Sequence, residues 1–555
     1  MKLFFLAFFS PIYIIWKIIY SIFSNLRKID FWDLLLLFFT FFAGYFFIFS
    51  NLGDYGFQTD EYYHAQIVDS YIKGYGLFKV KYLNNIIEHY TRSQITSLLA
   101  IVSKLFFDFF RIELSNEFIL RFPIGVVGVL NIIMIYKISN FLMGKFYSLC
   151  AALVFGSEIW IIYFAKYLRF YTIGIFFILF VFFLLFRYNF DKKSILFSLF
   201  ISIIGMLFVE LYLFLLFIIV LILFFIKFSE IIKTFYNSKK FLFLFFVALL
   251  LIIFLFIIGP KIGKILMNPR LVGWSFNKKY FEIMLNWILF NYPLLFVSFV
   301  LIFLICMFSN GIFTNNIRLF VLFNPKNLLV LFICANILFL FGYIINVPFN
   351  ITFRPISFFL PIMFIIYIYA LYYLSIPKIV FVSLVALNII FNIISINKYN
   401  IKSPGDYYYP TKLIYEKKDI VLGDKDVAKY LKNYISDNRI EKYKIHYVGA
   451  GAGFIAYYLN DYENIYSYAN TSNGVARYKD LENNIKINLN KTNFIVINPT
   501  AYANRVNHIY KEFFNRTYVV ECSTEISEQV HKKSEYKYLH TSDDKFTNIF
   551  IYNNL

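Results

Sequence analysis

Long runs without a charged residue recur along this 555-residue chain and constrain its fold more than any other feature. A transmembrane α-helix needs about 20 consecutive, mostly apolar residues, and each run approaches or exceeds that length. Only 15% of the residues are charged, whereas soluble proteins carry about 25%. We therefore predict a polytopic α-helical membrane protein. The runs are 34–53, 170–186, 241–260, 327–353, 355–377 and 379–397.

The basic balance of the chain, a formal net charge of +20, fits a membrane protein as well. Many of the Lys and Arg residues lie in short loops between apolar runs, which is typical of cytoplasmic loops that face anionic lipid. We therefore expect membrane lipids and no nucleic acid as partners. The four cysteines lack the spacing of metal ligands, so no zinc site and no disulfide framework is expected.

Basic loops also predict the orientation of the chain. "SNLRKI" (24–29), "FRYNFDKKS" (186–194) and "NSKK" (237–240) are interpreted as cytoplasmic. The stretch "GDYGFQTDEYYHA" (53–65) then lies on the outer face of the plasma membrane. Working outward from these loops predicts eleven spans, at 31–50, 122–141, 146–164, 170–187, 194–209, 211–227, 241–259, 285–308, 327–345, 356–375 and 378–396.

This scheme makes residues 51–121 one external loop. Within it, 95–110 is apolar but short and contains Lys104 and Asp108, so it is interpreted as a helix along the membrane surface. A second such helix is expected at 61–73. Residues 3–23 form either an interfacial helix or a twelfth span.

The composition changes near residue 401, where polar and charged residues take over. Strand-like pieces such as "KIHYV" (444–448) and "NFIVIN" (493–498) alternate with helical ones such as "DKDVAKYLKNYI" (424–435). We therefore divide the chain into an N-terminal apolar segment (1–30), a transmembrane domain (31–400) and an extracytoplasmic α/β domain (401–555).

The outer face collects unusual polar residues. Asp60 and Glu61 are adjacent at the edge of the first span, and Tyr63 and His64 follow within one helical turn. Two carboxylates at a membrane edge repel each other and lose solvation, which is a setting for a general base. The alternative is that acidic residues simply mark the wet end of a helix. We predict Asp60 and Glu61 as catalytic, and Tyr63 and His64 as substrate-binding.

Cationic residues also lie where later predicted spans meet the outer face of the membrane. In "FAKYLRFYT" (164–172), Lys166 and Arg169 are three residues apart and share a helical face. Snorkelling side chains explain many such cations, but the positive-inside bias disfavours them on the outer side. A phosphate would be a suitable anionic partner. The same argument applies to Arg354, which enters a later span.

Three further residues complete the candidate set. Arg92 and Arg121 are secondary candidates in the first external loop, and Arg92 joins the predicted substrate-binding residues. Glu210 interrupts an otherwise uncharged stretch, where a carboxylate is costly and often functional. By contrast, "VGAGAGF" (448–454) lacks the spacing of a dinucleotide loop and predicts a tight strand-to-helix turn.

These parts suggest one chemistry. A carboxylate deprotonates an acceptor hydroxyl, nearby cations neutralise a departing phosphate, and a membrane bundle binds a lipid tail. Together they predict sugar transfer from a lipid-phosphate donor at the outer face. Because the phosphate is already a good leaving group, no metal or other cofactor is expected to be required.

A known superfamily shows the same order of features. A first span, then "TDEYYHA", then "RFPIGVVGVLNIIMIYKISNFLMGKFYSLCAALVFG" (121–156) and "FAKYLRFYT" resembles the bacterial and archaeal relatives of protein O-mannosyltransferases and aminoarabinose transferases. These glycosyltransferase 39/83-like enzymes have the GT-C fold and use polyprenyl-phosphate-linked sugars. The likeness covers about 50–220 and is looser to 375, around "FRPISFFLP".

The resemblance implies specific roles. Asp60 would be the catalytic base of the first external loop with Glu61 beside it, and Arg169 and Arg354 would lie near the lipid phosphate. Arg92 stands where many relatives have a lysine in "KPP", and Lys166 replaces a more usual arginine. Inversion at the sugar is also implied. The acceptor would be a lipid glycan, a cell-wall polymer or a protein.

Two alternatives stay open from the sequence. One is transfer of a whole lipid-linked oligosaccharide, as in oligosaccharyltransferases, although the second external loop here is cationic rather than acidic. The other is a flippase or transporter of lipid-linked sugars. Transporters commonly show inverted repeats and polar residues at the midplane, and neither is evident in this sequence.

Overall fold

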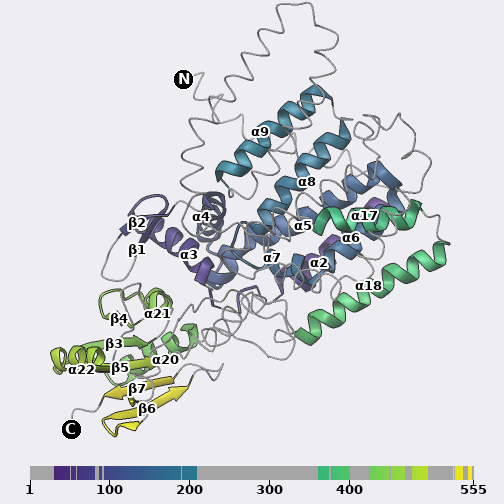
Figure 1. Cartoon of the computed structure of the whole chain (residues 1–555). Helices are drawn as coiled ribbons and strands as arrows, with labels where there is room; N and C mark the ends of the chain where they lie inside the picture. The colour runs from purple at the N-terminus through teal and green to yellow at the C-terminus, as the bar shows by residue number, and fades with distance from the viewer. Residues whose placement is uncertain are drawn as a thin grey trace, which may run out of the picture.

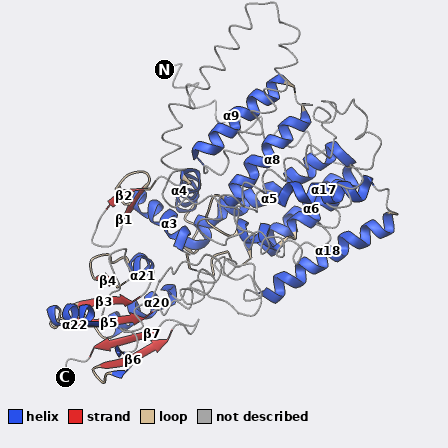
Figure 2. Cartoon of the chain, viewed as in Figure 1, coloured by secondary structure: helices blue, strands red, loops and turns tan. Residues whose placement is uncertain are grey.

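A computed structural model of the chain describes residues 31–50, 52–54, 56–57, 59–81, 87–90, 93–188, 191–208, 360–373, 377–399, 424–448, 452–468, 478–497, 529–530, 532–541 and 548–552. A bundle of helices lies next to a smaller domain that contains a sheet (Figure 1). Strands occur in this smaller domain and in one short pair beside α3 (Figure 2). A helical region followed by a sheet-containing C-terminal region is the order that the sequence predicts.

The helices of the bundle follow the apolar runs closely. Two described stretches have the length and composition to cross a membrane, Phe31–Phe49 and Asn116–Met143. The number of spans and their orientation stay predictions. The helices are α2 (Phe31–Ala43), the π-helix η1 (Gly44–Phe49), α5 (Asn116–Met143), α6 (Lys145–Gly156), α7 (Ile159–Ala165), α8 (Tyr171–Arg187), α9 (Lys192–Phe208), α17 (Leu360–Tyr373) and α18 (Lys378–Tyr399).

Several predicted segments cannot be compared with the structure. The expected spans at 211–227, 241–259, 285–308 and 327–345 lie outside the described residues, as do residues 3–23.

The single span predicted at 146–164 is wrong in one respect, because the structure divides it into α6 and α7. Glu158 lies between them with extended backbone and accepts a hydrogen bond from the N–H of Ile161 at 3.0 Å. An N-cap residue leaves the helical conformation to make this bond, so the preceding helix ends. The sequence is apolar on both sides of the break, so only the polar pair Ser157 and Glu158 marks it.

Contacts between helices define two ends of the bundle. At the Asp33 end, Asp33 at the start of α2 lies 3.7 Å from the Lys137 ammonium on α5 and 3.3 Å from that of Lys145 on α6. At the Glu61 end, Arg121 near the start of α5 donates to the carbonyl of Leu52, just beyond η1, at 3.0 Å. α2 and α5 therefore run antiparallel, as the predicted topology requires.

Two helices and a strand pair connect η1 to α5. They are α3 (Thr59–Ile72), β1 (Lys79–Lys81), β2 (Ile87–His89) and α4 (Gln94–Phe109). β1 and β2 pair antiparallel. The two helices predicted in this region, at 61–73 and 95–110, are confirmed. α4 exposes a row of apolar side chains at helical spacing, Val102, Leu105, Phe106 and Phe109, which suits the predicted position along a membrane surface.

The C-terminal domain is an α/β unit. Its sheet has the strand order β4-β3-β5-β7-β6; β3 runs parallel to β4 and β5, whereas β7 runs antiparallel to β5 and β6. The elements are α20 (Asp424–Asp437), β3 (Tyr443–Val448), α21 (Ala452–Leu459), β4 (Ile465–Ser467), α22 (Tyr478–Ile487), β5 (Thr492–Ile497), β6 (Tyr536–Thr541) and β7 (Asn548–Tyr552).

Alternation along β5 builds two cores. Phe494 and Val496 pack with side chains of α20 and α21, while Ile495 and Ile497 pack with those of α22. The predicted strands at 444–448 and 493–498 and the predicted helix at 424–435 are confirmed. The "VGAGAGF" segment lies between β3 and α21, but its residues 449–451 are outside the described residues, so the tight turn stays a prediction.

Candidate functional site

Asp60 and Glu61 stand in the first turn of α3. The structure describes Asp60 as a helical residue only, so its predicted role as base stays a prediction. Arg92, Glu210 and Arg354 lie outside the described residues.

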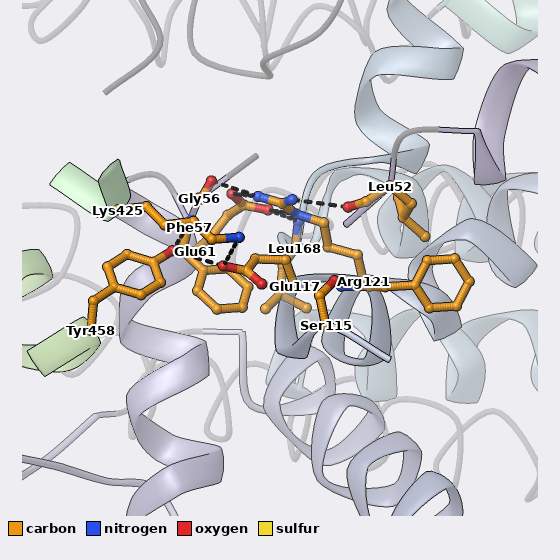
Figure 3. Close-up of polar contacts among 11 residues, drawn as sticks. Leu52, Gly56, Phe57, Glu61, Ser115, Glu117, Arg121, Leu168, Lys425 and Tyr458 are labelled. Atoms are coloured by element: carbon orange, nitrogen blue, oxygen red, sulfur yellow. Dashed lines mark hydrogen bonds and ion pairs between the residues drawn. The ribbon is translucent and has the colours of Figure 1, made fainter. Parts of the chain in front are cut away.

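The Glu61 carboxylate is completely buried in an ion pair with Arg121. Arg121 donates from Nε to Oε1 at 2.8 Å and from Nη2 to Oε2 at 2.7 Å (Figure 3). This bidentate geometry is the strong form of an arginine–carboxylate contact. The backbone N–H of Leu168 also donates to Oε1, at 2.8 Å. Each oxygen of the buried carboxylate thus has a donor.

Arg121 also contacts the chain that leads into α3. Its guanidinium donates to the carbonyls of Leu52 and Gly56, each at 3.0 Å, and its Cζ lies 5.3 Å from the ring centroid of Phe57. Removing one partner of such a buried pair leaves an uncompensated charge, which costs about 3–5 kcal/mol. The structure therefore gives Glu61 and Arg121 a clear positioning contact. A catalytic role for Glu61 stays a prediction.

Lys166 lies half-buried beside the end of η1. Its ammonium donates to the carbonyl of Ser50 at 2.8 Å. Burial lowers the pKa of Lys166 to about 8; Asp54 opposes this shift and Arg121 adds to it. The side chain is therefore a cation at neutral pH whose charge is easily lost at alkaline pH.

Tyr90 is the centre of a cluster that the sequence does not reveal. Arg169 donates from Nη1 to the Tyr90 hydroxyl at 3.3 Å. The rings of Tyr63 and Tyr90 are stacked with centroids 5.3 Å apart, and the His64 ring is edge-on to Tyr90 at 5.7 Å. His64 Nδ1 lies 2.8 Å from the Ser97 hydroxyl on α4. Three predicted site residues, Tyr63, His64 and Arg169, thus meet around one unpredicted tyrosine.

The acidic and cationic candidate segments are joined directly. The bond from the Leu168 N–H to Glu61 places the backbone between Lys166 and Arg169 against the first turn of α3. The turn that carries Asp60 and the cationic segment 166–169 therefore lie side by side at the Glu61 end of the bundle. That proximity is what base-assisted transfer away from a phosphate needs.

The C-terminal domain contacts this end of the bundle as well. Tyr458 on α21 accepts a hydrogen bond from the Phe57 N–H at 2.7 Å, and Lys425 on α20 lies 2.9 Å from the carboxylate of Glu117 on α5. Nothing in the sequence indicates these contacts, because the partners are more than 300 residues apart.

Within the described ranges, no group of three His, Cys, Asp or Glu side chains is arranged to hold a metal ion. The expectation that no metal is required stays a prediction.

No protein-family model matches the sequence, and no curated protein sequence matches it. Solved structures are nevertheless similar in fold. One is the oligosaccharyltransferase AglB from Archaeoglobus fulgidus in complex with an inhibitory peptide and a dolichol-phosphate. Its TM-score is 0.51 at 10% identity, over 94% of this chain and 74% of AglB. The apo form of an oligosaccharyltransferase from Archaeoglobus fulgidus gives a TM-score of 0.50 at 11% identity, over 95% of this chain and 75% of that one.

ArnT, the aminoarabinose transferase from Cupriavidus metallidurans, is similar over nearly its whole length. In the apo state it has a TM-score of 0.50 at 11% identity, over 94% of this chain and 97% of ArnT. AglB and ArnT are both GT-C glycosyltransferases, so the fold predicted from the sequence resemblance is confirmed: this chain has the GT-C fold.

Proposed function

We propose that this protein is an integral membrane glycosyltransferase that moves a sugar from a polyprenyl-phosphate-linked donor to an acceptor hydroxyl or amine. The reaction takes place on the outer face of the plasma membrane. The GT-C fold supports a lipid-linked donor in general, because the fold is shared with AglB and ArnT. The placement of the candidate residues supports the chemistry.

One observation carries this proposal. The buried Glu61 carboxylate contacts Arg121 and the Leu168 N–H at once, and so joins the Asp60 turn to the cationic segment 166–169. In a bundle of this fold, an acid next to cations at one end is the arrangement that transfer from a lipid phosphate requires.

The proposed reaction balances without a further reagent. The Asp60 carboxylate takes the proton of the acceptor hydroxyl, and the acceptor oxygen forms a bond to the anomeric carbon. The bond from that carbon to the phosphate oxygen breaks, and the electron pair leaves with the polyprenyl phosphate. The released charge is neutralised by Lys166 and Arg169, and by Arg354, which lies outside the described residues. Attack opposite the leaving phosphate inverts the anomeric centre.

Transfer of a complete oligosaccharide is the second candidate. It is favoured by the similarity to AglB, whose structure contains an inhibitory peptide and a dolichol-phosphate. A flippase of lipid-linked sugars is the third, and it would leave the bond between sugar and phosphate intact. The three candidates therefore differ in which bond breaks and in the size of the group that moves.

Reconstitution distinguishes them. The full chain in liposomes is supplied with radiolabelled polyprenyl-phosphate mannose or aminoarabinose and with envelope fractions that contain lipid glycans, wall polymers or proteins. We expect one polyprenyl phosphate released for each single sugar transferred. Transfer only of a preassembled oligosaccharide, or movement of intact donor across the bilayer, would contradict the proposal.

A further inference from the structure

The C-terminal domain contacts the segment that precedes Asp60 through a short polar chain. The Phe57 N–H donates to the Tyr458 hydroxyl at 2.7 Å, and that hydroxyl donates to Oε1 of Glu117 at 3.2 Å (Figure 3). The same carboxylate oxygen lies 2.9 Å from the Lys425 ammonium. Glu117 is buried, whereas the Lys425 side chain stays partly exposed.

Residues 56 and 57 are thereby contacted from two sides. Arg121 donates to the Gly56 carbonyl, while Tyr458 accepts from the Phe57 N–H. Glu117 and Arg121 are four residues apart on α5 and share one face of the helix. One helical face therefore connects the C-terminal domain to the short segment that leads into the Asp60 turn.

A simpler role for Glu117 would be to stabilise the start of α5, where an acidic residue favours the helix dipole. Ser115 already caps this helix by accepting from the Phe118 N–H at 3.3 Å. A dipole contact also requires no burial and no distant partner. Glu117 has both, so its contacts with Tyr458 and Lys425 need a further explanation.

Two glycines indicate a close and specific fit. A Cβ added to Gly56 would lie 3.0 Å from the Tyr458 hydroxyl and 3.2 Å from Cβ of Lys425. A Cβ added to Gly453 on α21 would lie 2.7 Å from the Tyr62 hydroxyl on α3. Glycine therefore lets the C-terminal domain approach the chain on both sides of Asp60.

The Tyr458 hydroxyl has fixed donor and acceptor roles in this series of hydrogen bonds. Burial, and secondarily the Glu117 charge, raises the pKa of Tyr458 well above its ordinary value. The hydroxyl thus keeps its proton, donates it to Glu117, and presents a lone pair to the Phe57 N–H.

We propose that Glu117 and Tyr458 are positioning residues through which the C-terminal domain fixes residues 56–57, and so the first turn of α3 that carries Asp60. The inference rests on the proposed function, because Asp60 is its base. It gives the C-terminal domain a part in transfer without placing any of its residues in contact with the reacting atoms.

A designed disulfide tests the contact independently of activity. Cysteines have Cβ atoms about 3.5–4.5 Å apart in a disulfide, so Gly56→Cys with Lys425→Cys should crosslink after a shift of a few tenths of an ångström. The matched control is Gly56→Cys with Lys429→Cys, one turn further along α20, where Cβ moves about 5–6 Å. We expect crosslinking of the first pair and little of the second. Equal or absent crosslinking would overturn the proposed contact.

Kinetics test the positioning role. Tyr458→Phe and Glu117→Ala should each lower kcat about ten-fold or more, since small misplacements of a catalytic group are costly, with donor KM little changed. Glu117→Gln keeps an acceptor for the Tyr458 hydroxyl and should restore much of kcat. Asn460→Gly is the control, because glycine accepts the positive φ of residue 460. It removes a contact of 2.7 Å between the same domain and Lys73, just beyond the far end of α3, and should leave kcat unchanged.

The outcomes separate the two proposals. Equal turnover of Tyr458→Phe and Asn460→Gly, with an active wild-type protein, would overturn the positioning role while leaving the proposed function intact. If the wild-type protein transfers no sugar from either donor, the proposed function fails and the positioning role fails with it. The disulfide yield then still decides whether the C-terminal domain contacts residues 56–57.

Discussion

The two ends of the bundle use the same ingredients with different results. At the Asp33 end, a carboxylate lies near Lys137 and Lys145, and all three side chains are partly exposed. At the Glu61 end, a carboxylate contacts one arginine and one backbone N–H, and the ion pair is buried. Each carboxylate ties α5 to a neighbouring segment.

The two ends differ in how strongly solvent screens their ion pairs. Exposed ion pairs contribute about 0–1 kcal/mol, because water screens them and ordering long side chains costs entropy. A buried, bidentate pair has no such screening, and breaking it is expensive. We infer that the two ion pairs of Asp33 are surface pairs, whereas the Glu61 contacts fix the geometry of the proposed site.

The largest expected effect is on stability at the Glu61 end. Arg121→Ala should destabilise the fold by about 3–5 kcal/mol, since it leaves the Glu61 charge buried without its partner. Thermal unfolding of the purified protein in detergent measures this as a fall in melting temperature. Lys145→Ala at the Asp33 end is the matched control. Similar melting temperatures for the two variants would remove the distinction between the ends.

Donor affinity should depend on Arg169. Charge-assisted hydrogen bonds contribute about 1.5–3 kcal/mol, so Arg169→Ala should weaken binding of a polyprenyl-phosphate sugar roughly ten- to a hundred-fold. Titration of the reconstituted protein with labelled donor gives the dissociation constant. Lys137→Ala removes a cation from the Asp33 end and should change nothing. Unaltered affinity in Arg169→Ala would remove this residue from the phosphate site.

Lys166 predicts a pH dependence at the Glu61 end. Its pKa of about 8 means that the ammonium is lost as pH rises through that value in the free protein. If it binds the lipid phosphate, kcat/KM for donor should fall above that pH. Lys166→Arg keeps a charge at all these pH values and should flatten the profile. A fall that persists unchanged in Lys166→Arg would assign it to another group.

The same group predicts the sign of a stability change. The folded pKa of Lys166 lies below its ordinary value of 10.5, so the unfolded chain binds more protons between the two pKa values. The free energy of unfolding should therefore increase as pH rises from about 8 toward 10.5. Lys166→Met should abolish this increment. Melting temperatures measured across that pH range check this prediction. If the variant is stabilised by rising pH as much as the wild type, another group causes the effect.

The smallest effect is expected at the Asp33 end. Lys137→Ala removes only the exposed contact between Lys137 and Asp33 and should cost at most about 1 kcal/mol. The melting temperature should stay close to that of the wild type, and turnover should be unaffected. A cost similar to that of Arg121→Ala would show that exposure is not what separates the two ends.

The sequence predicts much of the helical fold, since apolar runs and basic loops report local solvation. The helices over 31–49 and 171–187, and the amphipathic helix over 94–109, follow from such patterns. The helix over 116–143 follows only in part, because the sequence predicts its first turns, 116–121, as part of the external loop. The break at Glu158 does not, because one capping side chain interrupts a pattern that stays apolar on both sides.

The candidate site is only partly predictable for a similar reason. Tyr63, His64 and Arg169 are accessible to sequence reasoning because unusual polar residues stand out beside apolar runs. Tyr90 and Tyr458 are not, since tyrosine is common in a chain with 46 of them. Their importance comes from contacts between residues far apart in the sequence, and a local pattern does not predict such contacts.

The rate of sugar transfer by Asp60→Asn, beside Asp33→Asn, tests the central claim most directly. General-base catalysis contributes about 10²–10⁴-fold, so Asp60→Asn should lose turnover by that factor while donor binding and melting temperature stay near wild type. Asp33→Asn, an acid at the other end of the bundle, should transfer sugar normally. Near-normal turnover in Asp60→Asn would contradict the assignment of the base and with it the proposed site.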